Sequence, residues 1–160
     1  MTEITHFQSV KQFMKVFKQK YSTTPTADVS SDVIKLRLKL AVEELEELFF
    51  ALLNRQSQKF VNLHFKNLNA FIEAIDNDSL EIKLDEVADA VTDIEYINNG
   101  TAAVFGIPLD ETFREVHRSN MSKLDANGMP VFREDGKVIK SDLYSPPDIE
   151  SIIKGHLVNG

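Results

Sequence analysis

The sequence contains no cysteine, and it has only six glycines and five prolines among its 160 residues. The absence of cysteine excludes disulfides, thiolate nucleophiles and cysteine-based zinc sites, which is consistent with a protein of the reducing cytosol. The low glycine content and the many Leu, Ala, Glu and Lys residues favour helices. A chain of this length fits a single compact domain, and we therefore expect residues 1–160 to form one domain.

Long hydrophobic runs and an excess of positive charge are also missing. The longest apolar run, Leu48 to Leu53, is too short to span a membrane, and residues 1–20 lack the hydrophobic stretch of a signal peptide. The net charge of -7 argues against a surface that follows a nucleic acid backbone. We therefore expect a cytoplasmic protein that binds neither membranes nor nucleic acid. Any phosphate it binds then needs a local source of positive charge.

The spacing of apolar residues predicts an all-α fold, a bundle of about five helices with a short C-terminal hairpin or extended tail. Helices are expected at about residues 5–20, 31–54, 59–75, from a cap at Asp78 with Glu81 to a stop at Gly106, and 108–123. From these expected helices, we place the core of the domain at about residues 31–125 and the C-terminal tail at about 126–160. In the tail, Asp135-Gly136 between two short alternating runs predicts a hairpin, and a short amphipathic turn follows Asp148.

Acidic residues are concentrated in two of the expected helices, each time within apolar sequence. The first cluster contains Glu43, Glu44, Glu46 and Glu47, and the second contains Asp85, Glu86, Asp89 and Asp93. Each residue of a helix advances by about 100°. Glu43, Glu44 and Glu47 therefore share one side of their helix, while Glu46 points toward the opposite side. Two helices that pack with these acidic sides adjacent would gather most of the carboxylates in one place.

Carboxylates at this density repel one another and favour a bound cation. Like charges four residues apart destabilise a helix by roughly 0.2–0.5 kcal/mol, and no Lys or Arg occupies positions 50, 51, 90 or 97. Lys39 can reach Glu43, although in the less favourable order. Mg²⁺ and Mn²⁺ take carboxylate oxygens and keep positions open for water and phosphates. An ordinary solvated helix face is the alternative, and the spacing alone does not decide between the two.

A diiron site also collects glutamates from packed helices, but it requires two Glu-x-x-His motifs. His64, His117 and His156 have no Glu three residues before them. Only the pair Glu3 and His6, close to the N-terminus, fits the motif. The diiron interpretation is therefore disfavoured.

Beyond the carboxylates, several stretches of the chain resemble one enzyme superfamily. They are Arg37, residues 100–110, residues 113–123, and the tail from Asp125 through 132–140 to 146–148. Together with Glu43-Glu44-x-x-Glu47 and Glu86-x-x-Asp89, they resemble the all-α nucleoside triphosphate pyrophosphohydrolases, the MazG-like and phosphoribosyl-ATP pyrophosphohydrolase-like superfamily. The resemblance extends over roughly residues 31 to 150 and is most specific in its second half.

This resemblance implies a MazG-like fold and a hydrolase that cleaves an NTP or dNTP between its α and β phosphates, giving a monophosphate and pyrophosphate. The implied Mg²⁺ (or Mn²⁺) ligands are Glu43, Glu44, Glu47, Glu86 and Asp89, with Glu44 or Glu47 as the candidate base for the attacking water. The candidate substrate-binding residues are Arg118, Asn120, Lys123, Lys137 and Lys140. For the basic residues, pairing within the helix or exposure on the hairpin surface remains open. Family members are generally homodimers or homotetramers, so we expect the same here.

The sequence departs from the family pattern in two places. The segment between Glu47 and Glu86 is longer than expected, which suggests an inserted or lengthened helix around residues 56–77. Ser141-Asp142-Leu143 replaces a glycine-containing turn. Both departures concern the substrate pocket more than the metal site. Two other functions stay open: hydrolysis of phosphoribosyl-ATP, and a nonenzymatic helical module whose acidic faces bind a basic partner.

Overall fold

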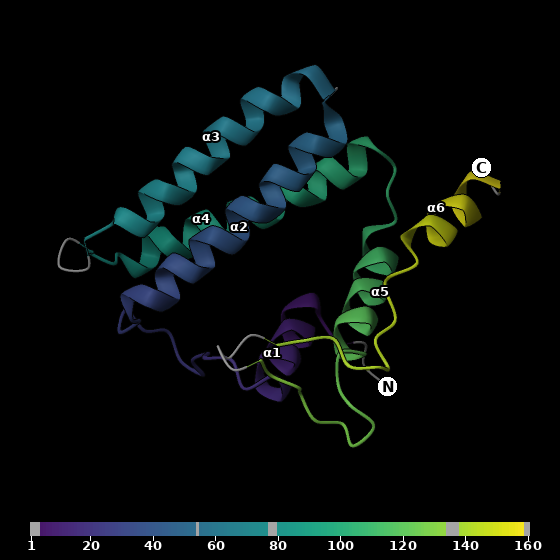
Figure 1. The fold of residues 1–160 in the computed structure, drawn as a ribbon, viewed down its shortest axis with the longest axis horizontal. Helices are drawn as coiled ribbons and strands as arrows, with labels where there is room; N and C mark the ends of the chain where they lie inside the picture. The colour runs from purple at the N-terminus through teal and green to yellow at the C-terminus, as the bar shows by residue number, and fades with distance from the viewer. Residues whose placement is uncertain (1–3, 54, 77–79, 134–137, 159–160) are drawn as a thin grey trace. The chain divides into compact units, whose positions relative to one another are not determined.

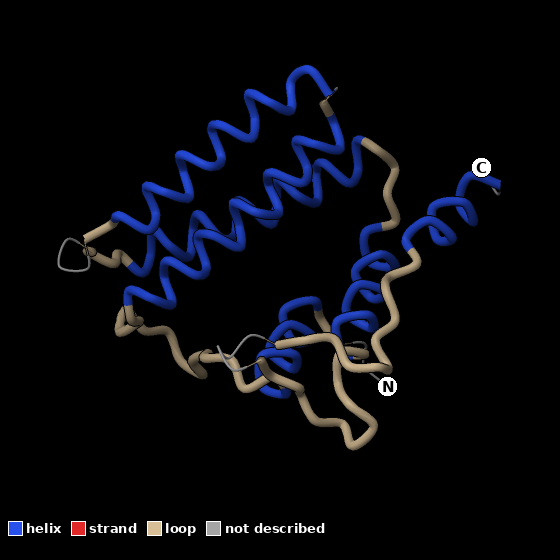
Figure 2. Tube along the Cα trace, viewed as in Figure 1, coloured by secondary structure: helices blue, strands red, loops and turns tan. Residues whose placement is uncertain are grey.

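The computed structural model describes residues 4–53, 55–76, 80–133 and 138–158. These residues form six helices and no strand (Figures 1 and 2). The helices are α1 (His6–Val16), α2 (Ser31–Leu52), α3 (Arg55–Ala74), α4 (Leu84–Val104), α5 (Leu109–Met121) and α6 (Ile149–Val158). The predicted all-α fold is confirmed.

The chain divides into two compact units, residues 24–87 and residues 1–23 with 88–160. Helix α4 begins in the first of these units and continues in the second. The expectation of one domain over residues 1–160 stays a prediction. No helix among the described residues has the length and apolar character needed to cross a membrane.

In the unit of residues 24–87, α2 and α3 lie side by side (Figure 1). Their shared core consists of Val42, Phe65 and Ile72, and the ring of Phe49 meets Phe65 edge to face at 5.6 Å between centroids. Burial of such side chains is worth about 1.5–3 kcal/mol each. The lengthened segment expected at residues 56–77 is therefore the partner helix that covers one side of α2.

The leucines of α2 do not form this core. Leu38, Leu45 and Leu52 are 42%, 46% and 53% exposed, because α3 packs on the side of α2 that carries Val42 and Phe49. Helix α2 therefore presents two apolar sides, of which α3 covers one. A helix that is apolar on more than one side normally needs a further partner.

In the other unit, α5 packs against both α1 and α6. Helix α1 begins with a capping box, in which Thr5 and Gln8 satisfy each other's backbone N–H groups. Gly106 follows α4 with φ of +64°, a backbone conformation that glycine adopts without strain, and α5 starts directly after Pro108. The stop predicted at Gly106 and the restart at Pro108 are confirmed.

The C-terminal tail contains two isolated antiparallel bridges, Leu124 with Pro130 and Phe132 with Val138. The expected hairpin turn at Asp135-Gly136 and the cap at Asp78 lie outside the described residues. The short turn predicted after Asp148 is instead a helix of 10 residues, α6. The Asp148 carboxylate accepts from the Ser151 backbone N–H at 3.1 Å and so caps this helix.

Candidate functional site

On α2, the three predicted metal ligands are exposed carboxylates. No ion pair among the described residues involves Glu43, Glu44 or Glu47. Lys39, which the sequence places within reach of Glu43, instead pairs with Glu73 of α3. Within the described part of the chain, the first acidic cluster therefore lacks the cation that an ordinary solvated face would normally supply.

The pKa of Glu44 is raised above its ordinary value of 4.5. Partial burial is the largest cause, and repulsion by the charges of Glu47 and Glu43 adds to it. Glu46 is half-buried, because it lies one turn after Val42 on the side of α2 that faces α3. The helical rotation predicts that Glu46 points away from Glu43, Glu44 and Glu47, and in the structure it points toward α3.

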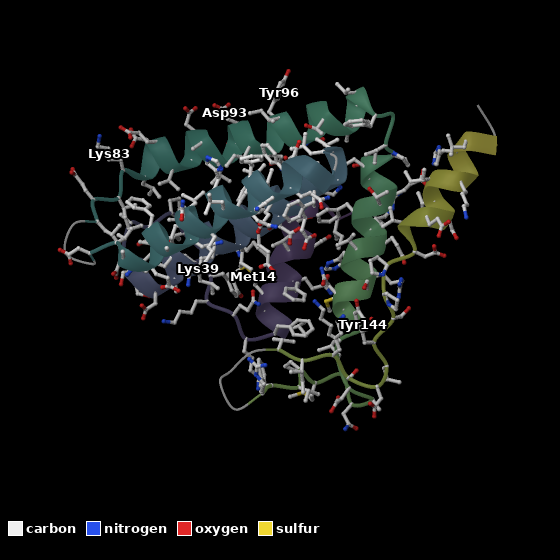
Figure 3. The ribbon with its side chains drawn as sticks, turned by 45° about the horizontal axis from the view of Figure 1, so that its top comes forward. Met14, Lys39, Lys83, Asp93, Tyr96 and Tyr144 are labelled. Carbon is white, nitrogen blue, oxygen red and sulfur yellow. The ribbon has the colours of Figure 1, made fainter. Side chains whose placement is uncertain are left out.

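On α4, the predicted ligands Glu86 and Asp89 are exposed, as is Asp93. Figure 3 shows the Asp93 side chain projecting from α4. Glu86 pairs with Lys83 at 3.1 Å, a partner that the sequence analysis did not consider. Both side chains of this pair are more than half exposed, and an exposed pair of this kind contributes about 0–1 kcal/mol. A metal ion can therefore displace Lys83 at small cost.

Among the described residues, no group of three or more His, Asp or Glu side chains is arranged to hold a metal ion. The chemistry of the predicted donors nevertheless fits one class of ion. Five carboxylates without histidine or cysteine are the donors preferred by hard divalent cations such as Mg²⁺ and Mn²⁺. Burial is the largest cause of the raised pKa of Glu44, and the repulsion by Glu47 and Glu43 that adds to it is what a bound cation would relieve.

Arg118 is hydrogen-bonded within its own unit. Its guanidinium donates to both carboxylate oxygens of Glu115, at 2.8 and 2.7 Å, and to the Pro146 carbonyl at 3.0 Å. The interaction holds the pKa of Glu115 at about 2, well below 4.5, with the Asp148 backbone N–H as a second donor. Arg118 therefore pairs with a carboxylate on its own helix, which is the alternative that the sequence analysis left open. It also anchors the tail through the Pro146 carbonyl.

Asn120, Lys123 and Lys140 come together at the C-terminal end of α5. The ammonium of Lys123 donates to the Asn120 side-chain oxygen at 2.8 Å. The ammonium of Lys140 lies 4.2 Å from the centroid of the Tyr144 ring. Lys137 lies outside the described residues. Three of the predicted substrate-binding residues therefore belong to one cluster around Tyr144.

Tyr144 is the residue of this cluster that sequence reasoning missed. It lies beside α5 (Figure 3) and is hydrogen-bonded to the side chains of Ser119 and Lys140. Periodicity does not reveal such a contact, because Tyr144 and Ser119 are far apart in sequence. The only signal was its place within the tail that resembles the superfamily, directly before Ser145-Pro146-Pro147.

A hollow of about 440 Å³ lies between α1 and α5. His6 lines it, stacked on Phe113 at 3.8 Å between centroids and paired with Asp110 at 3.2 Å. His117 also lines it, and burial lowers the pKa of His117 below 6.5. His6, the one histidine that fits a diiron motif, thus contributes to the packing of α1 on α5.

The fold defines an all-α protein of the pyrophosphohydrolase class. A solved structure from Exiguobacterium sp. 255-15, described as a "putative NTP pyrophosphohydrolase", matches with a TM-score of 0.77 and 27% identity, over 99% of each chain. The model of the phosphoribosyl-ATP pyrophosphohydrolase family matches residues 10–120, and the chain belongs to this family. The superfamily resemblance seen in the sequence is confirmed.

A viral relative gives no further functional information. The chain is 26% identical over 140 residues to an uncharacterized protein of Acanthamoeba polyphaga mimivirus. This match includes 86% of the chain but spans 43% of the viral protein. The family and the solved structure therefore carry the functional argument, and both support a pyrophosphohydrolase.

Proposed function

We propose that the protein is a metal-dependent nucleoside triphosphate pyrophosphohydrolase, which cleaves an NTP or dNTP to the monophosphate and pyrophosphate. The observation that carries this proposal is the acidic side of α2, where Glu43, Glu44 and Glu47 have no cationic partner among the described residues. Membership of a pyrophosphohydrolase family supplies the reaction class.

In this proposal, Mg²⁺ or Mn²⁺ is held by Glu43, Glu44, Glu47, Glu86 and Asp89. When bound, the metal neutralises phosphate oxygens and lowers the pKa of a water molecule. Glu44 and Glu47 are the two candidate bases for this water. Either one takes the proton of the water that attacks the α phosphate.

The phosphate chain needs positive groups as well as metal. Asn120, Lys123 and Lys140 supply a hydrogen-bonding amide and two ammonium groups in one cluster on α5 and the tail. Arg118 makes a smaller contribution to substrate binding in this scheme, because Glu115 and the Pro146 carbonyl already engage its guanidinium.

A product assay tests the proposed function. Common and modified nucleoside triphosphates are incubated with Mg²⁺, with Mn²⁺ or with EDTA, and pyrophosphate and orthophosphate are measured separately. We expect metal-dependent release of pyrophosphate. Glu86→Gln should abolish it, whereas Glu95→Gln, the same change at another exposed position of α4, should not. Orthophosphate as the first product, or full activity in EDTA, would exclude the mechanism.

Phosphoribosyl-ATP is the second candidate substrate, favoured by the description of the family whose model matches. It belongs in the same panel, where faster hydrolysis of phosphoribosyl-ATP than of any free triphosphate would favour this alternative. A nonenzymatic acidic module would bind metal and release pyrophosphate from none of the substrates.

The exposed apolar side chains support assembly of two or four copies of the chain in the cytoplasm. On α4, Val91, Ile94 and Ile97 are 61%, 55% and 65% exposed, and the α2 leucines add a further apolar side. Apolar side chains at helical spacing and with this exposure are typical of interfaces between subunits. A second copy is the occupant implied by the family resemblance, and we propose a homodimer or homotetramer.

A further inference from the structure

The segment of residues 141–148 is fastened along the C-terminal half of α5 and the residues after it. Its hydrogen bonds are Ser141 Oγ to the Leu124 carbonyl (2.6 Å), Ser145 N–H to Ser122 Oγ (2.9 Å), Arg118 Nη2 to the Pro146 carbonyl (3.0 Å) and Asp148 N–H to Glu115 Oε1 (2.8 Å). Contacts on both sides of Tyr144 thus fix the backbone that carries it. Tyr144 is held at one place on α5 by its neighbours, independently of its own side chain.

The phenol of Tyr144 joins a buried group, Ser119, to one charged group, Lys140. It is hydrogen-bonded to Ser119, whose residue is only 3% exposed, and to the ammonium of Lys140. The positive charges of Lys140 and Lys123 also act on it, and together with these hydrogen bonds they lower the pKa of Tyr144 below 10.0. A buried hydroxyl partner restricts the orientation of the ring, because the bond is lost if the ring rotates away.

The two ammonium groups have no carboxylate partner among the described residues. Lys123 is held by Asn120 at 2.8 Å and lies 6.0 Å from the centroid of the Phe13 ring, while Lys140 lies over Tyr144. Two like charges gathered by neutral groups repel each other, and an anion placed between them removes this repulsion. Ammonium groups in such a setting are donors suited to phosphate oxygens.

We propose that Tyr144 is a positioning residue, which holds the Lys140 ammonium so that it forms, with Lys123 and Asn120, one binding site for a chain of phosphate groups. That this chain belongs to a nucleoside triphosphate rests on the proposed function. The Tyr144→Phe substitution would keep the ring beneath Lys140 but lose the oxygen that joins Ser119 to the lysine. The phenol oxygen, and not the ring alone, is therefore the feature to remove.

The test measures binding of inorganic tripolyphosphate by calorimetry, in EDTA and at low salt. Loss of one hydrogen bond corresponds to about a fivefold change in affinity, so we expect Tyr144→Phe to weaken binding by about fivefold. Ser119→Ala removes the same bond from the other partner and should act in the same direction. Tyr21→Phe is the matched control, because Tyr21 also lies beside a lysine, Lys11, at 5.8 Å. It should leave the affinity unchanged.

With a nucleotide substrate, Tyr144→Phe should raise KM by about fivefold and leave kcat within twofold, since a positioning residue acts on binding. Lys140→Met should raise KM similarly, and Lys140→Arg should restore most of the affinity. Wild-type affinity for tripolyphosphate in both Tyr144→Phe and Ser119→Ala would overturn the proposal, as would failure of the unaltered protein to bind it. Binding that depends on Tyr144 without any nucleotide hydrolysis would uphold this site and reject the proposed function instead.

Discussion

The α5 region and the acidic segments of α2 and α4 use charge in opposite ways. Around α5, acidic side chains have partners: Glu115 pairs with Arg118 on the same helix, Asp110 with His6 of α1, and Glu111 with His156 of α6. In the acidic segments, the one ion pair among the described predicted ligands is the exposed pair of Glu86 and Lys83. Acidic side chains of the first region are therefore engaged by their neighbours, whereas those of the second remain available to a ligand.

This contrast distinguishes structural from functional roles among residues that look equivalent in the sequence. Arg118 and Lys123 are both basic residues near the end of α5 within the stretch that resembles the superfamily. The guanidinium of Arg118 binds a carboxylate and a carbonyl, whereas the partners of Lys123 among the described residues are neutral, the amide of Asn120 and the ring of Phe13. A charge with neutral partners keeps its attraction for an ionic ligand, because nothing compensates it.

The largest effect should come from removing charge within the acidic cluster of α2. Glu44→Gln or Glu47→Gln should lower kcat by about 10²-fold or more, because in the proposed mechanism one of them serves as base and both as metal ligands. Glu46→Gln removes the same charge from the half-buried side that faces α3 and should retain turnover. Steady-state kinetics with saturating Mg²⁺ measures all three. Equal losses of kcat in the three variants would contradict the assignment of different roles to the two sides of α2.

A substitution on the exposed side of α4 should change assembly. Ile94→Asp places a charge among exposed apolar side chains, so it should convert the proposed homodimer or homotetramer into a smaller species at micromolar concentration. Sedimentation velocity measures the change. Glu95→Gln, at the adjacent exposed position, is the control and should sediment like the unaltered protein. The prediction fails if the unaltered protein is already a stable monomer.

A smaller effect should follow from breaking the charge pairing around α5. Glu115 has a pKa of about 2 in the folded protein and 4.5 as its ordinary value, so its ionised form stabilises the fold above pH 4.5. This stabilisation is lost as the pH falls from 4.5 through 2. Glu115→Gln should therefore lower Tm at pH 7, and the difference from the unaltered protein should shrink toward pH 2.

Thermal unfolding at several pH values measures this difference. Glu150→Gln is the control, because Glu150 pairs with Lys154 on the exposed surface of α6 and anchors no other element. It should change Tm very little at any pH. A difference between Glu115→Gln and the unaltered protein that stays constant from pH 7 to pH 2 would show that the carboxylate charge does not hold the tail.

The sequence predicted those parts of the molecule that depend on local signals. Apolar periodicity placed the helices, and Gly106 and Pro108 marked the end of α4 and the start of α5. The sequence did not predict which side of α2 is covered, because Leu45 and Phe49 are both apolar and only α3 decides between them. It underestimated α6, whose cap at Asp148 also depends on Glu115, far away in sequence.

Within the candidate site, residue type and spacing drew attention to the carboxylates, and the resemblance supplied the predicted ligand set and the predicted substrate-binding residues Asn120, Lys123 and Lys140. The pairing of Lys39 with Glu73 and the position of Tyr144 on Ser119 were not predictable, because both join segments distant in the chain. These long-range contacts determine which charges are compensated. Roles can therefore be assigned to the candidate residues only when these long-range contacts are known.

The most direct test of the metal site is the titration of the Glu44 carboxyl by ¹³C NMR, with and without Mg²⁺. Burial and the charges of Glu47 and Glu43 raise its pKa in the free protein, and a bound divalent cation favours the ionised form. We predict that saturating Mg²⁺ lowers the pKa of Glu44 below 4.5. A pKa of Glu44 that remains raised and unchanged at millimolar Mg²⁺ would contradict the assignment of these carboxylates to a metal ion.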